Sequence, residues 1–138
     1  MKRILGLDYG DQRIGVALSD PGCLIATPHS VLRHIGWGPT ARSVKQLLEK
    51  TGSEYIVLGL PYNADGSLGT QAQEVLGFAG VLRQQGLRVE LQDERLTSME
   101  AEDSLRAGGK NWQQSKTLVD QVAASLILQA YLDARRVE

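Results

Sequence analysis

Two short apolar runs near the start of the chain, joined by a polar turn, constrain the fold most. Arg3–Asp8 and Ile14–Leu18 each have the length and content of a strand, and turn-forming residues such as Gly10 lie between them. The runs therefore predict a hairpin with Asp8 at the end of its first strand. Because side chains alternate faces along a strand, Gly6 shares a face with Asp8 and leaves space beside the carboxylate.

Asp8 has two interpretations at this point. A carboxylate at the end of an apolar strand is costly to desolvate unless a metal ion, another cation or a helix N-terminus binds it. Asp8 could equally begin the turn as an Asx-type residue with no further role. This stretch alone leaves both interpretations open.

The remainder of the chain alternates helices and strands. A third strand is expected over Cys23–Leu32, where Pro28 favours an edge position because proline cannot donate to a central ladder. The apolar run Tyr55–Leu60 is typical of a strand covered on both faces. The other predicted elements are helices over Thr40–Lys50 and Thr70–Gln85, a strand over Leu87–Leu91, a helix that starts at Thr97 and stops at Gly108, and a final helix from Ser115 or Thr117 to Ala134.

This order of elements predicts an α/β fold: a five-stranded mixed sheet, with three antiparallel strands followed by two parallel ones, and helices on both faces. The 138 residues have the size of a single domain, and 42% apolar with 22% charged residues is an ordinary globular composition. No apolar run reaches membrane length, so we expect a cytoplasmic protein without a membrane partner. The single cysteine, Cys23, excludes an internal disulfide and a cysteine zinc cage.

Three acidic positions fall where the pattern predicts little contact with water. Asp8 ends the first strand, the pair Asp93 and Glu94 ends the fifth, and Asp120 lies among apolar neighbours in the last helix. Strand alternation sends Asp93 and Glu94 to opposite faces, so one of the two looks where Asp8 looks. Open α/β sheets place their sites at the ends of adjacent parallel strands.

Asp120 shares a helical face with Ala123, Ala124 and Ile127. The two alanines would let the helix approach the sheet closely, as a short carboxylate needs to do to meet two strand ends. In the alternative interpretation, Thr117 and Asp120 form a capping box, and Asp120 only satisfies the first turn of the helix.

Oxygen ligands from separate elements suit Mg²⁺ or Mn²⁺. Two such ions can activate a water and stabilise the leaving oxygen of a phosphodiester. The net charge of −1 gives no general attraction to nucleic acid and does not exclude it. The candidate phosphate contacts are Arg13, Arg95, Lys110 and Lys116.

Two other features have less specific patterns. The loop from Gly59 to Gly66, with a helix start at Thr70 behind it, could hold phosphates or simply connect a strand to a helix. His29 and His34 are expected to be ordinary strand or surface residues, because the pattern places no partner near them.

Four motifs follow one another along the chain and together cover nearly all of it. They are Asp8-Tyr9-Gly10-x-x-Arg13-Ile14-Gly15-Val16-Ala17, Gly59-Leu60-Pro61 with Asn63 and Asp65-Gly66, Asp93-Glu94-Arg95-Leu96-Thr97-Ser98, and Val119-Asp120-x-x-Ala123-Ala124 with Ile127-Leu128-Gln129 and Tyr131-Leu132. In this order the motifs resemble the YqgF family. Its members are bacterial Holliday junction resolvases, also described as nucleases that trim the precursor of small-subunit ribosomal RNA.

The resemblance implies a ribonuclease H-like fold with an acidic site that depends on Mg²⁺ or Mn²⁺, with two ions expected. Carried over position by position, it implies that Asp8, Glu94 and Asp120 are the catalytic, metal-binding carboxylates and that Asp93 is secondary. The resulting prediction is a single nuclease domain over residues 1–138 that hydrolyses phosphodiester bonds as a monomer or homodimer. It would process the 5′ end of precursor 16S ribosomal RNA or resolve Holliday junctions, with nucleic-acid contacts from Arg13, Arg95 and Lys116.

Two functions of other classes stay open from the sequence. A non-catalytic RNA-binding or ribosome-associated factor would agree with the nearly neutral charge, and its binding would survive removal of divalent ions. An actin-like ATPase is the second, because Asp8, Gly10 and Arg13 also resemble the first phosphate loop of those enzymes. The length argues against the ATPase, since such enzymes clamp nucleotide between two domains of this kind.

Overall fold

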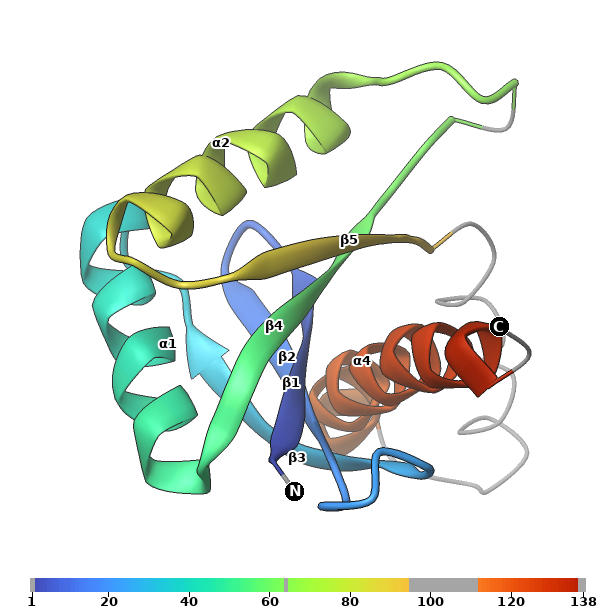
Figure 1. The fold of residues 1–138 in the computed structure, drawn as a ribbon. Helices are drawn as coiled ribbons and strands as arrows, with labels where there is room; N and C mark the ends of the chain where they lie inside the picture. Colours follow the sequence, from blue (N-terminus) through green and yellow to red (C-terminus); the bar gives the residue numbers. More distant parts are fainter. Residues whose placement is uncertain (1, 64, 95–111, 137–138) are drawn as a thin grey trace.

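A five-stranded sheet with the strand order β3-β2-β1-β4-β5 forms the centre of the protein in a computed structural model (Figure 1). β2 pairs antiparallel with β1 and β3, whereas β4 pairs parallel with β1 and β5. The predicted mixed sheet is therefore confirmed. The strands are β1 (Arg3–Tyr9), β2 (Arg13–Ser19), β3 (Ala26–Arg33), β4 (Ser53–Leu60) and β5 (Val89–Asp93).

Helices cover both faces of this sheet, as predicted. The helices α1 (Trp37–Thr51) and α2 (Thr70–Gln84) pack on one face, and α4 (Trp112–Arg136) packs on the other (Figure 1). The structure describes all residues except 1, 64, 95–111 and 137–138, and only the backbone of 112–117. The helix predicted from Thr97 to Gly108 lies outside the described residues. In the described part of the chain, no helix is long and apolar enough to cross a membrane.

Strand alternation decides which face of the sheet carries Asp8. Leu5 and Leu7 are buried in the apolar layer under α1 and α2, whereas Ile4 is buried in the layer under α4. Asp8 follows Ile4 with the same parity along β1, so its side chain lies on the α4 face. The acidic end of β1 is thus directed toward the helix that carries Asp120.

Several predicted element boundaries are a few residues off, among them the starts of β3 and α4. β3 begins at Ala26 rather than Cys23, because the Asp20 carboxylate accepts hydrogen bonds from the backbone N–H groups of Leu24 and Ile25 at 2.8 and 2.9 Å and holds a loop there. α4 begins at Trp112, eight residues before Asp120. The interpretation of Asp120 as part of a capping box is therefore wrong, since the residue lies inside the helix.

Candidate active site

Two carboxyl groups meet where β1 and β5 end. Asp8 is the next-to-last residue of β1, and Glu94 directly follows β5, where its backbone N–H donates to the carbonyl oxygen of Leu60 at 3.3 Å. The Glu94 and Asp8 carboxyl groups are hydrogen-bonded to one another. Glu94 is only 8% exposed, although it belongs to a residue type that is rarely buried. The parallel strands thus bring together two of the acidic residues singled out from the sequence.

Burial makes this carboxyl pair hard to ionise. It raises the pKa of Asp8 from its ordinary 3.8 to about 6, an effect that the charge of Asp120 increases and the hydrogen bond from Glu94 partly opposes. Burial and then the charge of Asp8 raise the pKa of Glu94 from 4.5 to about 9. At neutral pH the pair therefore holds one proton, with Glu94 donating to Asp8.

The raised pKa values predict how the stability of the metal-free protein depends on pH. A raised carboxyl pKa means that the folded state holds its proton more tightly than the unfolded chain. The stabilisation is complete below about pH 4 and is lost as the pH rises to about 9. Glu94→Gln cannot ionise, so we expect it to be more stable than the wild type at pH 9 by on the order of 2 kcal/mol, and close to it at pH 4.

Urea unfolding with a chelator, followed by circular dichroism between pH 4 and 9, measures this difference. Glu49→Gln, which changes an exposed carboxylate on α1, is the control and should keep the pH dependence of the wild type. Parallel stability curves for Glu94→Gln and the wild type would contradict the prediction.

Asp120 reaches the same end of the sheet from α4 but has its own partner. Its Oδ2 atom accepts a hydrogen bond from Arg13 Nε at 2.6 Å, in an ion pair whose side chains are 38% exposed for Arg13 and 21% for Asp120. Among the described residues, no group of three or more His, Cys, Asp or Glu side chains is arranged to hold a metal ion as it stands. In this structure Asp120 is engaged by Arg13, and the Asp8 and Glu94 carboxyl groups are engaged with one another.

Glycines in three strands make this close approach possible. A Cβ atom at Gly15 would lie 1.9 Å from the backbone oxygen of Asp120, and one at Gly59 would lie 2.6 Å from Glu94 Oε2. The space predicted beside Asp8 at Gly6 is filled by α4, since a Cβ atom there would lie 2.8 Å from Leu128 Cβ. Nothing in the local sequence pattern marks Gly15 and Gly59 as positioning residues, although both belong to the motifs quoted above.

Of the other predicted site residues, Asp93 lies at the edge of the carboxyl pair, and the side chains of three basic residues lie outside the described part of the structure. Asp93 ends β5 with an exposed side chain, so Glu94 and not Asp93 is the member of the pair that faces Asp8. The charge of Asp93 adds to the raised pKa of Glu94. Arg95 and Lys110 lie outside the described residues, and Lys116 falls where only the backbone of α4 is described.

The prediction that His34 has no partner is wrong. His34 Nε2 lies 3.0 Å from the Tyr9 hydroxyl and Nδ1 lies 2.9 Å from the Thr40 hydroxyl, and Trp37 Nε1 donates to the Tyr9 hydroxyl at 3.0 Å. These contacts position Tyr9, which follows Asp8 and points to the opposite face of the sheet. The antiparallel ladder returns the chain to this point, which a local pattern does not reveal. His29 is exposed beside Ser30, as expected.

The chain has relatives of known name over nearly its whole length. The chain is similar to proteins named "Putative pre-16S rRNA nuclease" from Synechocystis sp. (44% identity over 133 residues, 96% of this chain and 88% of the relative) and Chloroflexus aurantiacus (46% over 137 residues, 96% and 88%). A protein of the same name from Clostridium acetobutylicum is 40% identical over 133 residues, 96% of this chain and 98% of the relative.

Solved structures of resolvases have the same fold. The Thermus thermophilus RuvC structure in complex with a Holliday junction substrate has a TM-score of 0.61 at 15% identity, covering 99% of this chain and 97% of that one. The Fowlpox virus resolvase with its substrate Holliday junction DNA has a TM-score of 0.56 at 14% identity, covering 96% and 98%. The ribonuclease H-like fold implied by the motifs is thereby confirmed.

The family comparison agrees with the curated relatives. It identifies the protein as a nuclease, an enzyme that acts on nucleic acid, and favours neither the non-catalytic RNA-binding factor nor the ATPase. The model of the RuvX family, described as Holliday junction resolvase, matches residues 2–134. The resemblance to the YqgF family is confirmed, and the chain belongs to the RuvX family of Holliday junction resolvases.

Proposed function

We propose that this nuclease is a cytoplasmic, metal-dependent enzyme, a single domain over residues 1–138, that cleaves phosphodiester bonds at the 5′ end of precursor 16S ribosomal RNA. Asp8, Glu94 and Asp120 would be its catalytic carboxylates. The observation that carries the proposal is the hydrogen-bonded pair of Asp8 and Glu94, buried at the strand ends with raised pKa values and beside the charge of Asp120. Perturbed carboxyl groups gathered at one place are typical of catalytic sites.

The chemistry of these residues fits Mg²⁺ or Mn²⁺. Asp8, Glu94 and Asp120 offer only carboxylate oxygens, which these ions prefer. Asp8 and Glu94 would hold such a cation with both carboxyl groups ionised, because a divalent charge offsets the cost of removing the proton that they share. Asp120 would complete the set of carboxylates that hold the metal, and two ions are expected.

The other residues at the site have supporting tasks. Divalent ions at such a site activate water and stabilise the charge of the leaving oxygen. The Arg13 guanidinium, whose Nε atom donates to Asp120, has further N–H donors that would bind a substrate phosphate. Gly15 and Gly59 keep α4 and Glu94 within reach of the strand ends.

The choice of substrate rests on the names of the relatives. The relatives at 40–46% identity are named for precursor 16S ribosomal RNA, whereas the junction complexes are 14–15% identical and share the fold. Resolution of Holliday junctions is the second candidate, favoured by the description of the family. A junction has two-fold symmetry, so paired cuts would require a dimer.

Cleavage of two substrates side by side tests the proposal. A labelled precursor 16S fragment and a synthetic four-way DNA junction are incubated with the wild type and Mn²⁺ or a chelator. We expect cleavage of the RNA that stops with the chelator. Cleavage of the junction alone, together with a dimer in light scattering, would favour the resolvase. Metal-independent binding without any cleavage would overturn the nuclease proposal.

A further inference from the structure

A groove lies directly beside the ion pair of Arg13 and Asp120, outside the carboxyl pair. Its volume is about 680 Å³, and the turn between β1 and β2 and the end of β3 form its walls. The residues that line it are Asp11, Gln12, Arg13, Val31, Arg33 and His34. The groove thus begins at the candidate active site and continues toward the edge strand.

Two arginines stand opposite each other in this groove. Arg13 and Arg33 are directly paired in the ladder of β2 and β3, so their side chains leave the sheet on the same face. Like charges at directly opposite positions destabilise a sheet unless something neutralises them. Asp120 neutralises Arg13. In the part of the chain that the structure describes, no carboxylate forms an ion pair with Arg33, whose side chain is exposed.

The two sides of the β1–β2 turn differ in their balance of charge, because Asp11 borders both hollows but only the groove adds the arginines Arg13 and Arg33. On the α2 side a second hollow is lined by Asp11, Thr70, Gln71 and Glu74. The negative charges of Glu74 and Asp11 both contribute to the raised pKa of Tyr9, which places them near the end of β1. A phosphate backbone leaving the active site would be repelled on this side and attracted on the side of Arg33.

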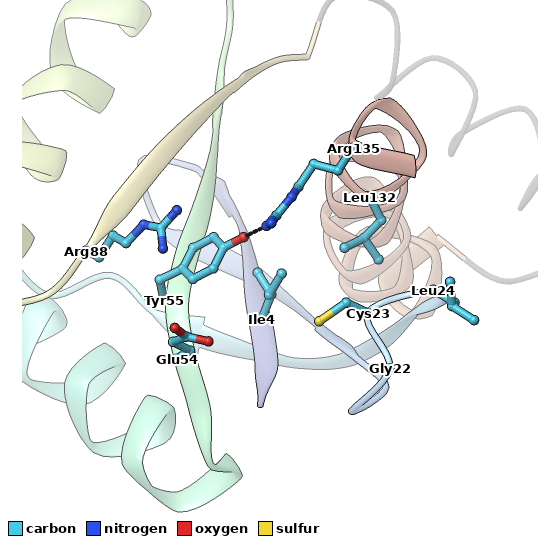
Figure 2. A pocket seen from close by; sticks show the side chains of 9 residues that line it. All are labelled: Ile4, Gly22, Cys23, Leu24, Glu54, Tyr55, Arg88, Leu132 and Arg135. Atoms are coloured by element: carbon cyan, nitrogen blue, oxygen red, sulfur yellow. Dashed lines mark hydrogen bonds between the residues drawn. The ribbon is translucent and has the colours of Figure 1, made fainter. Parts of the chain in front are cut away.

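A cavity at the other end of α4 also contains two arginines, but their charges are already used within the protein. This cavity has a volume of about 300 Å³ and is drawn in Figure 2. Arg88 pairs with Glu90 at 2.9 Å and stacks on the Tyr55 ring at 3.9 Å from its centroid. Arg135 donates to the Tyr55 hydroxyl, and Glu54 lies at the wall. This cavity is therefore a weaker candidate for a phosphate site than the groove beside Arg13 and Arg33.

We propose that the groove between Arg13 and Arg33 binds the sugar-phosphate backbone of the substrate next to the cleaved bond, with Arg33 as a dedicated phosphate contact. This inference rests on the proposed function, because the cleaved bond is placed at Asp8 and Glu94. Arg33 contributes to binding and not to the chemistry. The guanidinium is suited to this role, since its N–H donors match two phosphate oxygens at once.

Substitution of Arg33 tests the groove by binding as well as by cleavage. For Arg33→Gln we expect a five- to tenfold higher KM on a single-stranded precursor 16S fragment, with kcat changed less than twofold. The Kd of the same RNA, measured by fluorescence anisotropy with a chelator, should rise by a similar factor. The slope of log Kd against log salt should become smaller by about 0.7, the value for one phosphate contact on a single strand.

Two further variants make the result specific. Arg42→Gln removes an exposed arginine from α1, on the other face of the sheet, and should leave Kd unchanged. Arg33→Lys keeps the charge and should recover part of the affinity. The proposal that this groove binds RNA would be overturned if Arg33→Gln had the Kd of the wild type. It would also be overturned if Arg33→Gln and Arg42→Gln lost affinity equally. Wild-type protein that binds RNA through Arg33 without cleaving it would instead overturn the proposed function.

Discussion

Replacing Asp8 by Asn is expected to abolish metal-dependent cleavage while the protein stays folded. Asn has nearly the shape of Asp and can still hydrogen-bond to Glu94, but it has no charge to offer a cation. Asp8 also connects the three carboxyl groups, since it is hydrogen-bonded to Glu94 and the charge of Asp120 raises its pKa. We expect kcat to fall by on the order of a thousandfold or more, the range found when a group that acts in the transition state is removed.

Three measurements separate this effect from misfolding. Cleavage of the precursor 16S fragment gives the rate, titration calorimetry with Mn²⁺ gives the loss of ion binding, and urea unfolding gives the stability. Asp133→Asn, an exposed carboxylate near the far end of α4, is the matched control and should retain wild-type cleavage. Full metal-dependent activity in Asp8→Asn would show that the acidic cluster is not the active site.

Replacing Gly15 by Ala is expected to cost the largest loss of stability among the substitutions considered. The added Cβ atom would lie 1.9 Å from the backbone oxygen of Asp120 and 2.4 Å from its carbonyl carbon. Both are backbone atoms of a helix and cannot rotate aside, so α4 must shift away from β2. We expect a loss of about 3 kcal/mol, at the upper end of overpacking effects, and a loss of cleavage because Asp120 moves with the helix.

Gly80→Ala is the matched control for this substitution. Gly80 lies in α2, and among the described residues a Cβ atom there would have no atom within 4 Å beyond the adjacent backbone of its own helix. Alanine favours a helix over glycine by about 1 kcal/mol, so this variant should be slightly more stable than the wild type. Urea unfolding of both variants gives the comparison. A Gly15→Ala protein as stable as the wild type would contradict the close contact between β2 and α4.

Local patterns along the chain were enough to predict the architecture. The mixed sheet, its edge strand with Pro28 and the helices on both faces follow from apolar runs, alternation and turn residues, each of which depends on neighbours a few positions away. The same alternation indicated that only one of Asp93 and Glu94 faces Asp8. The choice of Glu94 came from the resemblance to a family, because alternation relates neighbours to each other without telling which face meets a given helix.

Contacts between distant segments were decided only by the tertiary structure. Arg13 meets Asp120 across 107 positions of sequence, and Tyr9 meets His34 across 25. The residues around Gly15 in the sequence do not indicate that the backbone of α4 packs against it. Such contacts depend on the angle and distance at which whole elements pack, which many apolar side chains set together. The sequence by itself therefore determined the elements and the acidic residues at their ends, whereas the partner of each charge was decided by packing.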